Sequence, residues 1–250
     1  TDYVFYVRNV CSGENSGWVA GYFRTACADV FTLPFNEGFN DGILDPPIYA
    51  IPATMPTPST TEECWTILDL SPAEAPSNAS WGMNYWGSGT YEGDNSAALF
   101  TGSNQGKNDD YLITPRLDLT GNDRLRFVAK SYGPAQGLNT MEVLMSSNTN
   151  AAEDFTLVLS PAYEYPGGDQ WTAVFVDLSA YTGAHYIAFH VPPTDEEGFY
   201  MFVDEVVIEQ IPTCDYPTNV TVSNLTSTSA DLSWDAGMSG ETEWEYVLQA

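Results

Sequence analysis

The chain has 250 residues, of which 43% are hydrophobic and 14% aromatic, and its 7 Lys and Arg against 34 Asp and Glu give a formal net charge of −27. This charge argues against binding to nucleic acids or anionic lipid surfaces, which are themselves negative. No hydrophobic run reaches the roughly 18–20 residues that cross a bilayer. Because only 16% of residues are charged and aromatic residues are frequent, the composition favours β-structure over disorder. The excess acids form either a solvated acidic surface or ligands for divalent cations, chiefly calcium.

Residues 1–27 resemble the end of a fibronectin type III module. TDYVFYVRNVC (1–11) has alternating polarity and places Tyr3 where strand F of such modules has its corner tyrosine. SGWVAGYFRTAC (16–27) is interpreted as strand G. The chain shows no signal peptide and opens inside a strand, so we expect it to come from a longer mature protein.

Residues 28–211 are predicted to form the central domain. Short alternating runs, such as YLITPRLDL, TMEVLMSS and HYIAFHV, are separated by Gly, Pro, Asn, Asp and Ser. Such spacing predicts an all-β fold, an antiparallel sandwich or jelly roll. Residues 42–63 are rich in Pro and Thr and are expected to be an irregular surface insertion. Residues 71–108 are expected to be long loops with one short strand at SAALFTG.

The domain ends on the apolar run GFYMFVDEVVIEQI (198–211). A period of two places alternate residues on opposite faces, with Tyr200, Phe202, Asp204, Val206 and Ile208 together and Phe199, Met201, Val203, Glu205 and Val207 together. Both faces are apolar, which predicts a strand buried on both sides. An unpaired buried carboxylate costs several kcal/mol or more, so Asp204 and Glu205 call for a counter-charge.

Residues 212–250 resemble the start of another fibronectin type III module. CDYPTNVTVSNLTSTSADLSWDA (214–236) is interpreted as strands A and B, with Trp234 as the core tryptophan, and WEYVLQA (244–250) as strand C. Neither partial module contains enough strands to bury its own core. They are either truncated modules or pieces that complement the ends of neighbouring copies.

The four cysteines lack the spacing of a zinc site and favour an oxidised, extracellular protein. Cys27 follows the last strand of the first module and Cys64 opens the run CWTILDL, so we predict that they pair. Such a bond stabilises by roughly 3–4 kcal/mol through its effect on the unfolded chain. Cys11 and Cys214 are expected to bond within their own modules, to partners beyond this chain. The alternative is four unrelated buried thiols.

The central stretch resembles the cleaved-adhesin, or choice-of-anchor J, domain. The likeness rests on LPFNEGFND (33–41), CWTILDL (64–70), DDYLITP (109–115) and the final VDEVVI (203–208). These domains occur in large secreted and cell-surface proteins of Bacteroidota, including the haemagglutinin/adhesin repeats of gingipains, often beside fibronectin type III modules. The resemblance implies a jelly roll related to galactose-binding-like and MAM domains, with structural calcium and export by the type IX system.

Calcium ligands follow from the same resemblance. In related jelly rolls an early Glu and a late Asp share a calcium ion, which points to Glu37 and Asp204. Backbone carbonyls near Asn40 and Asp41 would complete the shell. Asp109 and Asp110 are weaker candidates, since an exposed turn explains them equally well, and Glu205 is a doubtful ligand. Without calcium, Asp204 would be satisfied by backbone N–H groups or by a basic residue.

The sequence is compared with three classes of function, of which the first is an enzyme. No nucleophile–base pair or catalytic motif is found, and His185 and His190 are predicted to lie on opposite faces of one strand. The chain is therefore predicted not to be an enzyme, although a glycosidase is not ruled out by residue type alone.

The second class is a carbohydrate-binding module that uses Trp81, Tyr85, Trp86 and Tyr91 of the Gly-rich run 80–96. The alternative is that Trp81 and Trp86 cover the core. The third and favoured class is a calcium-stabilised repeat of a surface adhesin or fibre. Its partners would be a host or matrix protein, a glycan or neighbouring copies of the same protein.

Overall fold

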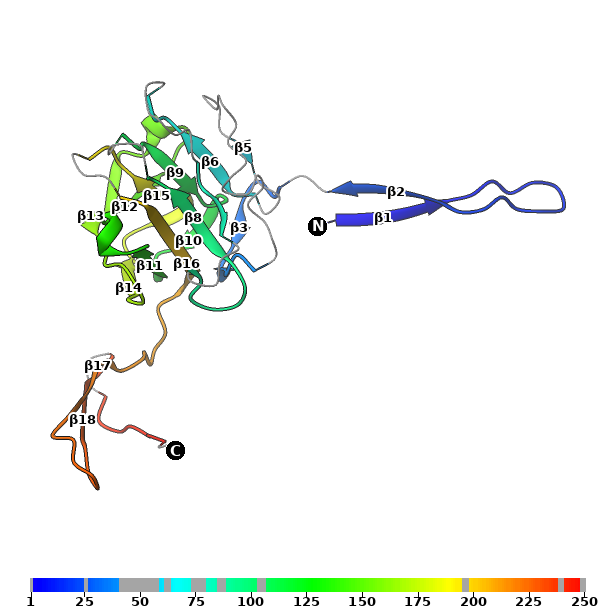
Figure 1. The fold of residues 1–250 in the computed structure, drawn as a ribbon. Helices are drawn as coiled ribbons and strands as arrows, with labels where there is room; N and C mark the ends of the chain where they lie inside the picture. Colours follow the sequence, from blue (N-terminus) through cyan, green and yellow to red (C-terminus); the bar gives the residue numbers. More distant parts are fainter. Residues whose placement is uncertain are drawn as a thin grey trace. The chain divides into compact units, whose positions relative to one another are not determined.

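Two β-sheets packed face to face form the central part of the chain (Figure 1). The computed structural model describes residues 2–24, 27–40, 59–60, 64–72, 80–84, 89–102, 107–194, 198–237 and 241–247. The chain divides into two units, Thr1–Glu209 and Gln210–Ala250. The sheets lie in the first unit, and the predicted all-β sandwich is confirmed.

The larger sheet has eight strands. Its neighbours pair antiparallel, except that β10 and β3 run parallel. Most runs that alternate in the sequence become strands here, including the one that holds DDYLITP. In sheet order the strands are β13 (Leu157–Glu164), β12 (Thr140–Ser146), β15 (Thr182–Val191), β9 (Asp110–Ile113), β6 (Thr66–Asp69) and β5 (Ser59–Thr60), while β10 (Leu117–Thr120) pairs with β15 and β3 (Phe31–Thr32) pairs with β10.

The smaller sheet has six strands, and the long last strand of the domain lies at its centre. The expected strand at SAALFTG is present, and a second strand at Gly82–Asn84 was not predicted. Residues 42–58 and 61–63 of the predicted insertion lie outside the described residues. In sheet order the strands are β14 (Thr172–Asp177), β11 (Asp123–Ser131), β16 (Tyr200–Gln210), β8 (Ser96–Phe100) and β7 (Gly82–Asn84), while β4 (Phe35–Glu37) also pairs with β16.

The core between the sheets is built from the inward-facing residues of both. Alternation along each strand turns every second side chain inward, and burying an aliphatic or aromatic side chain stabilises by roughly 1.5–3 kcal/mol. Helical structure in the described residues is limited to short 3-10 turns such as η2 (Pro134–Gln136) and η3 (Ala152–Asp154). The largest fully buried side chains include Trp65, Trp81, Tyr165, Phe39 and Phe127.

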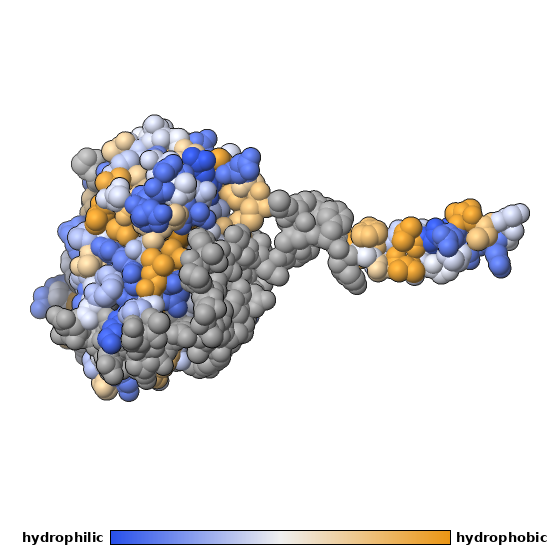
Figure 2. Space-filling model, turned by 90° about the horizontal axis from the view of Figure 1, so that it is seen from above, coloured by the Kyte–Doolittle hydropathy of each residue, from blue (hydrophilic) through white to orange (hydrophobic). Residues whose placement is uncertain are grey.

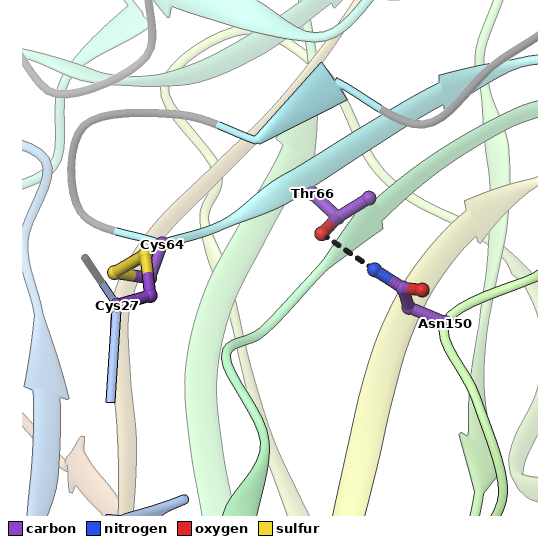
Figure 3. Close-up of a disulfide and its surroundings, with 4 residues drawn as sticks. All are labelled: Cys27, Cys64, Thr66 and Asn150. Carbon is purple, nitrogen blue, oxygen red and sulfur yellow. Dashed lines mark hydrogen bonds between the residues drawn. A yellow bond between two sulfur atoms is a disulfide. The ribbon is translucent and has the colours of Figure 1, made fainter. Parts of the chain in front are cut away.

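A disulfide joins Cys27 to Cys64, as predicted (Figure 3). The two Cα atoms lie 5.6 Å apart and the bond closes a separation of 37 residues. In the same view Asn150 Nδ2 donates a hydrogen bond of 3.0 Å to Thr66 Oγ1, which ties the loop after β12 to the start of β6 (Figure 3). Cys11 and Cys214 are exposed free thiols, and their predicted bonds to partners beyond the chain stay a prediction.

Each end of the chain carries a two-stranded hairpin. β1 (Asp2–Val7) pairs with β2 (Val19–Arg24), and β17 (Thr218–Ser223) pairs with β18 (Asp231–Asp235), where strands F, G, A and B were predicted. Residues 244–247 of the predicted strand C are not in a strand. Both hairpins expose apolar side chains, such as Tyr6 and Val220, and Figure 2 shows hydrophobic residues along the first one. Their assignment to fibronectin type III modules stays a prediction.

Candidate functional site

A β-bulge interrupts strand β16 at its two acidic residues. Before it, Met201 and Val203 face the core and the strand pairs with β8. After it, Val206 and Ile208 face the core and the strand pairs with β4. Glu205 has a φ of 51°, and one extra residue of this kind moves every later side chain to the opposite face. The uniform two-face alternation predicted from the sequence is therefore wrong, because it assumed an unbroken strand.

Asp204 lies at this bulge and is fully buried, as predicted. Its Oδ2 accepts hydrogen bonds from the backbone N–H groups of Tyr91 at 2.9 Å and Glu92 at 3.4 Å, and its Oδ1 accepts one from Glu205 N–H at 2.8 Å. The pKa of Asp204 is nevertheless raised to about 6, because burial, together with the smaller effect of the Glu205 charge, outweighs these bonds. No ion pair with a basic residue is found for Asp204 within the described ranges.

Glu37 and Asn40 are brought to the same bulge by strand β4 and the turn after it. Glu37 lies opposite Val206 in the β4–β16 register. Its Oε1 accepts a hydrogen bond from Phe39 N–H at 2.6 Å, and its Oε2 accepts one from the Trp65 indole at 3.4 Å.

Asn40 Oδ1 accepts the N–H groups of Asp94 at 2.7 Å and Asn95 at 3.3 Å, so Asn40 fastens the 91–95 loop to the turn. A Cβ at Gly38 would lie 3.0 Å from Glu205 Oε1 and 3.1 Å from Asn40 Nδ2, which shows that these two side chains converge. We call Glu37, Asn40, Asp204 and Glu205 the Asp204 group. Asp41 lies outside the described residues.

The carboxylates of the Asp204 group and the backbone carbonyl of Asn40 are oxygen ligands of the kind that Ca²⁺ accepts, whereas Asn40 Oδ1 already accepts two N–H groups. Burial and the nearby charge of Glu92 raise the pKa of Glu205, while Arg126 lowers it. Over the part of the chain that the structure describes, no three His, Cys, Asp or Glu side chains are arranged to hold a metal by themselves. A cation here would therefore need amide, backbone or water oxygens beside the carboxylates. On the chemistry of the donors and the burial of Asp204, the residues fit calcium.

Asp109 and Asp110 belong to a different acidic group on the eight-stranded sheet. His190 contacts Asp109 Oδ1 through Nε2 and Glu142 Oε1 through Nδ1, each at 2.8 Å. Asp110 is fully buried, so the alternative of an exposed turn is wrong for it. Its Oδ2 accepts a hydrogen bond of 2.8 Å from Asn108 Nδ2, and its Oδ1 has no hydrogen-bond partner.

Asp110 also faces Asp69 directly across the β6–β9 register. Burial and the charge of Asp69 raise the pKa of Asp110 well above the ordinary value. Burial also raises the pKa of Asp69. We call Asp69, Asp109, Asp110 and His190 the Asp110 group. A fully buried carboxyl beside a half-buried one, both with raised pKa values, favours a proton retained on Asp110.

The predicted aromatic candidates do not form one platform. Trp81 is 1% exposed and its indole donates a hydrogen bond of 3.4 Å to the backbone oxygen of Asp110, so its predicted role in stacking on a sugar is wrong. A buried indole has no face to offer a ligand. Tyr91 is 53% exposed, as a platform residue must be. Tyr85 and Trp86 lie outside the described residues.

Sequence reasoning missed Trp171, which lies beside Tyr91. The two ring centroids are 5.6 Å apart, with ring planes at 70°. Lys130 Nζ lies 4.9 Å from the centroid of the Trp171 ring. Trp171 follows the Gly167-Gly168 pair and directly precedes an alternating run. Its place just before a strand was the signal in the sequence that could have marked it as a candidate.

Comparisons with known proteins agree with this architecture. The family model described as Cleaved Adhesin Domain matches residues 62–208. No curated protein sequence matches the chain significantly. The first unit is thus a β-sandwich of the adhesin type, and the chain belongs to the cleaved adhesin family.

Among solved structures, the chain is similar to the K1 cleaved adhesin domain of Lys-gingipain from Porphyromonas gingivalis W83. The identity is 22%, the match covers 72% of this chain and 99% of that one, and the TM-score is 0.52. The K3 domain of the same protein gives 22% identity, 70% and 96% coverage, and a TM-score of 0.48. The CBM22-1 xylan-binding domain of Paenibacillus barcinonensis Xyn10C gives 12% identity, 72% and 95% coverage, and a TM-score of 0.40.

Proposed function

We propose that this chain is a non-catalytic attachment module of an extracellular or cell-surface protein and that calcium at the Asp204 group stabilises it. Membership of the cleaved adhesin family supports the attachment role. The partner would be a host or matrix protein, a glycan or a neighbouring copy. No helix within the described ranges is long and apolar enough to cross a membrane.

The observation that carries the calcium proposal is the state of Asp204. Its carboxylate is fully buried, three backbone N–H groups reach it, and its pKa is still raised to about 6. Those bonds therefore do not compensate for the loss of water around the charge, and a divalent cation would. When bound, calcium supplies that positive charge. Glu37 and the backbone carbonyl of Asn40 would hold it from β4 and the following turn, and Asp204 from β16.

The engagement of the histidines supports a non-catalytic role. His190 contacts carboxylates through both ring nitrogens, and His185 Nε2 lies 3.0 Å from the backbone oxygen of Thr182. Both side chains are nearly buried. A general base needs a nitrogen that reaches the substrate, and these rings are held inside the sheet instead.

Thermal unfolding with calcium and with chelator tests the stabilising role. At a calcium concentration of 100 times its dissociation constant, binding adds about 2.7 kcal/mol, which raises Tm by about 5–10 °C for a chain of this size. Asp204→Asn should lose that shift. The matched control is Asp177→Asn, because Asp177 also accepts a backbone N–H but is exposed. A wild-type Tm that chelation leaves unchanged would remove the calcium proposal.

Attachment is tested separately, by binding of the whole chain to immobilised matrix proteins, glycoproteins and a second copy of itself. Saturable binding to one of these surfaces supports the role. Turnover of any of them by the chain would contradict it.

A further inference from the structure

The outer face of the six-stranded sheet carries a cluster of aromatic side chains. Because side chains alternate along a strand, the residues of β8, β11 and β16 that do not enter the core point outward. On this face the outward residues form a second apolar cluster instead of a polar surface. Its buried members are Ala98, Tyr200 and Phe202, with Phe100, Trp171 and Phe199 packed against them.

The rings of this cluster touch one another in a continuous row. Phe199 lies 5.4 Å from Phe100 and 4.7 Å from Tyr200, measured between ring centroids. Tyr200 stacks on Phe202 at 5.8 Å. Lys130 Nζ lies 5.7 Å from the Phe202 ring and 4.9 Å from the Trp171 ring, and so connects the row to Trp171. The row opens to solvent at Tyr91, which is 53% exposed and packs edge-on against the half-buried Trp171.

Tyr91 and Trp171, which we call the aromatic pair, come from two loops that are 80 positions apart and are each fastened to the sheet. Tyr91 N–H donates to Asp204 Oδ2 at 2.9 Å. On the other side, Lys130 donates a hydrogen bond of 2.9 Å to the backbone oxygen of Gly168 and places its ammonium over the indole. A pair held in this way loses little conformational entropy when a ligand binds.

Polar groups with free access to solvent flank the aromatic pair. Glu92 follows Tyr91 directly, and Asp169 and Gln170 precede Trp171, and all three are exposed. Their carboxylate and amide oxygens accept hydrogen bonds from hydroxyl groups. Two adjoining aromatic rings surrounded by acceptors match a sugar ring, whose C–H faces pack on aromatic rings while its hydroxyls donate outward.

The charge of the chain narrows the class of ligand. Glu92, Asp94 and Asp169 are acidic and exposed around the aromatic pair, and the formal net charge is −27. An anionic glycan would be repelled, and so would a second copy of this chain with the same charge. Among the described residues, Lys130 is a cation at the pair; it is 3% exposed, lies against the rings and interacts with the charge of Asp169, while Glu92 and Asp94 remain as exposed acids that repel anions.

We propose that Tyr91 and Trp171 form a binding site for neutral saccharides, with Glu92, Asp169 and Gln170 accepting hydrogen bonds from the sugar hydroxyls. This proposal rests on the attachment role and names the ligand class that the module attaches to.

Calorimetric titration of the whole chain in calcium buffer tests the proposal. The probes are four neutral oligosaccharides, namely cellotetraose, xylotetraose, mannotetraose and β-1,4-galactotriose, with sialyllactose and tri-galacturonic acid as charged counterparts. At least one neutral probe should bind at millimolar concentration or below, and the charged ones should not. Tyr91→Leu and Trp171→Ala should each weaken that binding by about tenfold, the loss expected when one packed ring is removed.

Two further variants serve as controls. Tyr91→Phe retains the ring and should retain the affinity. Tyr163→Leu removes a tyrosine of matched exposure, 52%, from β13 of the other sheet, and should change nothing. Should Trp171→Ala lower Tm strongly, the Tyr91 variants alone decide, since that side chain is exposed.

The proposal is overturned if no neutral probe binds, if the charged probes bind better, or if Tyr91→Leu and Tyr163→Leu behave alike. It is also overturned if Tyr91→Leu changes only self-association in sedimentation, which would make the pair a contact between copies. Attachment to a protein surface with no sugar binding would refute the saccharide site and leave the attachment role standing.

Discussion

Asp204 and Asp110 are both fully buried carboxyl groups, yet the groups that face them in the sandwich differ. Asp204 receives three backbone N–H groups, two of them from the loop that carries the exposed Tyr91. Asp110 receives side-chain donors on Oδ2, leaves Oδ1 without a partner and faces the carboxyl of Asp69. Backbone donors favour the ionised form, whereas a second carboxyl favours a retained proton. The difference teaches that burial alone does not decide how a carboxyl is satisfied, and that the groups facing it do.

The largest expected effect comes from removing the Asp204 carboxylate. Asp204→Ala leaves the N–H groups of Tyr91, Glu92 and Glu205 without their acceptor, at a cost of about 3 kcal/mol. Urea unfolding in chelator measures this loss. Asp177→Ala, which removes an exposed acceptor of one backbone N–H, should cost under about 1 kcal/mol. Equal losses of stability in the two variants would contradict a structural role for Asp204 beyond that of an exposed acceptor.

The second-largest expected effect is a difference between the two acidic groups in the calcium-dependent rise in Tm. Asp110→Asn is expected to keep the whole calcium-dependent rise in Tm, because the Asp110 group takes no part in the proposed site. Asp204→Asn is expected to lose it. Scanning calorimetry of both variants with calcium and with chelator gives the answer, and the reverse pattern would move the cation to the Asp110 group.

A smaller effect is expected from the pH dependence of Asp110. Its folded pKa is raised above the unfolded value of about 3.9. The resulting stability is fully present below the unfolded pKa and is lost as the pH rises through the folded pKa. At neutral pH, Asp110→Asn should therefore stabilise by about 1 kcal/mol, because its amide offers an oxygen to Asn108 and an N–H group to Asp69. Urea unfolding at pH 5 and 7.5 in chelator should show that the variant loses less stability between the two pH values than the wild type does. Equal losses in the two proteins would contradict a proton retained on Asp110.

The smallest effect concerns the bulge itself. Glu205 has a φ of 51°, which glycine adopts without strain. Glu205→Gly should stabilise by about 0.5–1 kcal/mol in chelator, through relief of strain and of the repulsion from Glu92. Chemical unfolding beside the wild type measures it. A clear loss of stability would mean that the Glu205 side chain has a structural role of its own.

Much of the fold was predictable because alternation and turn residues are local signals. The runs at β9, β12 and β15 were recognised from their period, and the Cys27–Cys64 bond from the positions of its cysteines. The strand at Gly82–Asn84 was missed, since three residues among glycines carry no readable period.

The site was predictable in part. The sequence drew attention to Asp204 because a carboxylate in an apolar strand is costly, and the family resemblance added Glu37 and Asn40. The bulge at Glu205 was not predictable, since no glycine marks the position of positive φ. The burial of Trp81 and the contact between Tyr91 and Trp171 were not predictable either, because each depends on which loops the sheets bring together.

By itself the sequence determined the acidic charge, the β-class and the presence of carboxylates in a buried strand, which follow from composition and local period, and its motifs carried the resemblance to the family. Only the tertiary structure decided which carboxylate receives backbone donors, which faces a second acid and which aromatic rings remain exposed. The physical reason is that these properties belong to contacts between segments far apart in the chain, and a local pattern carries no information about them.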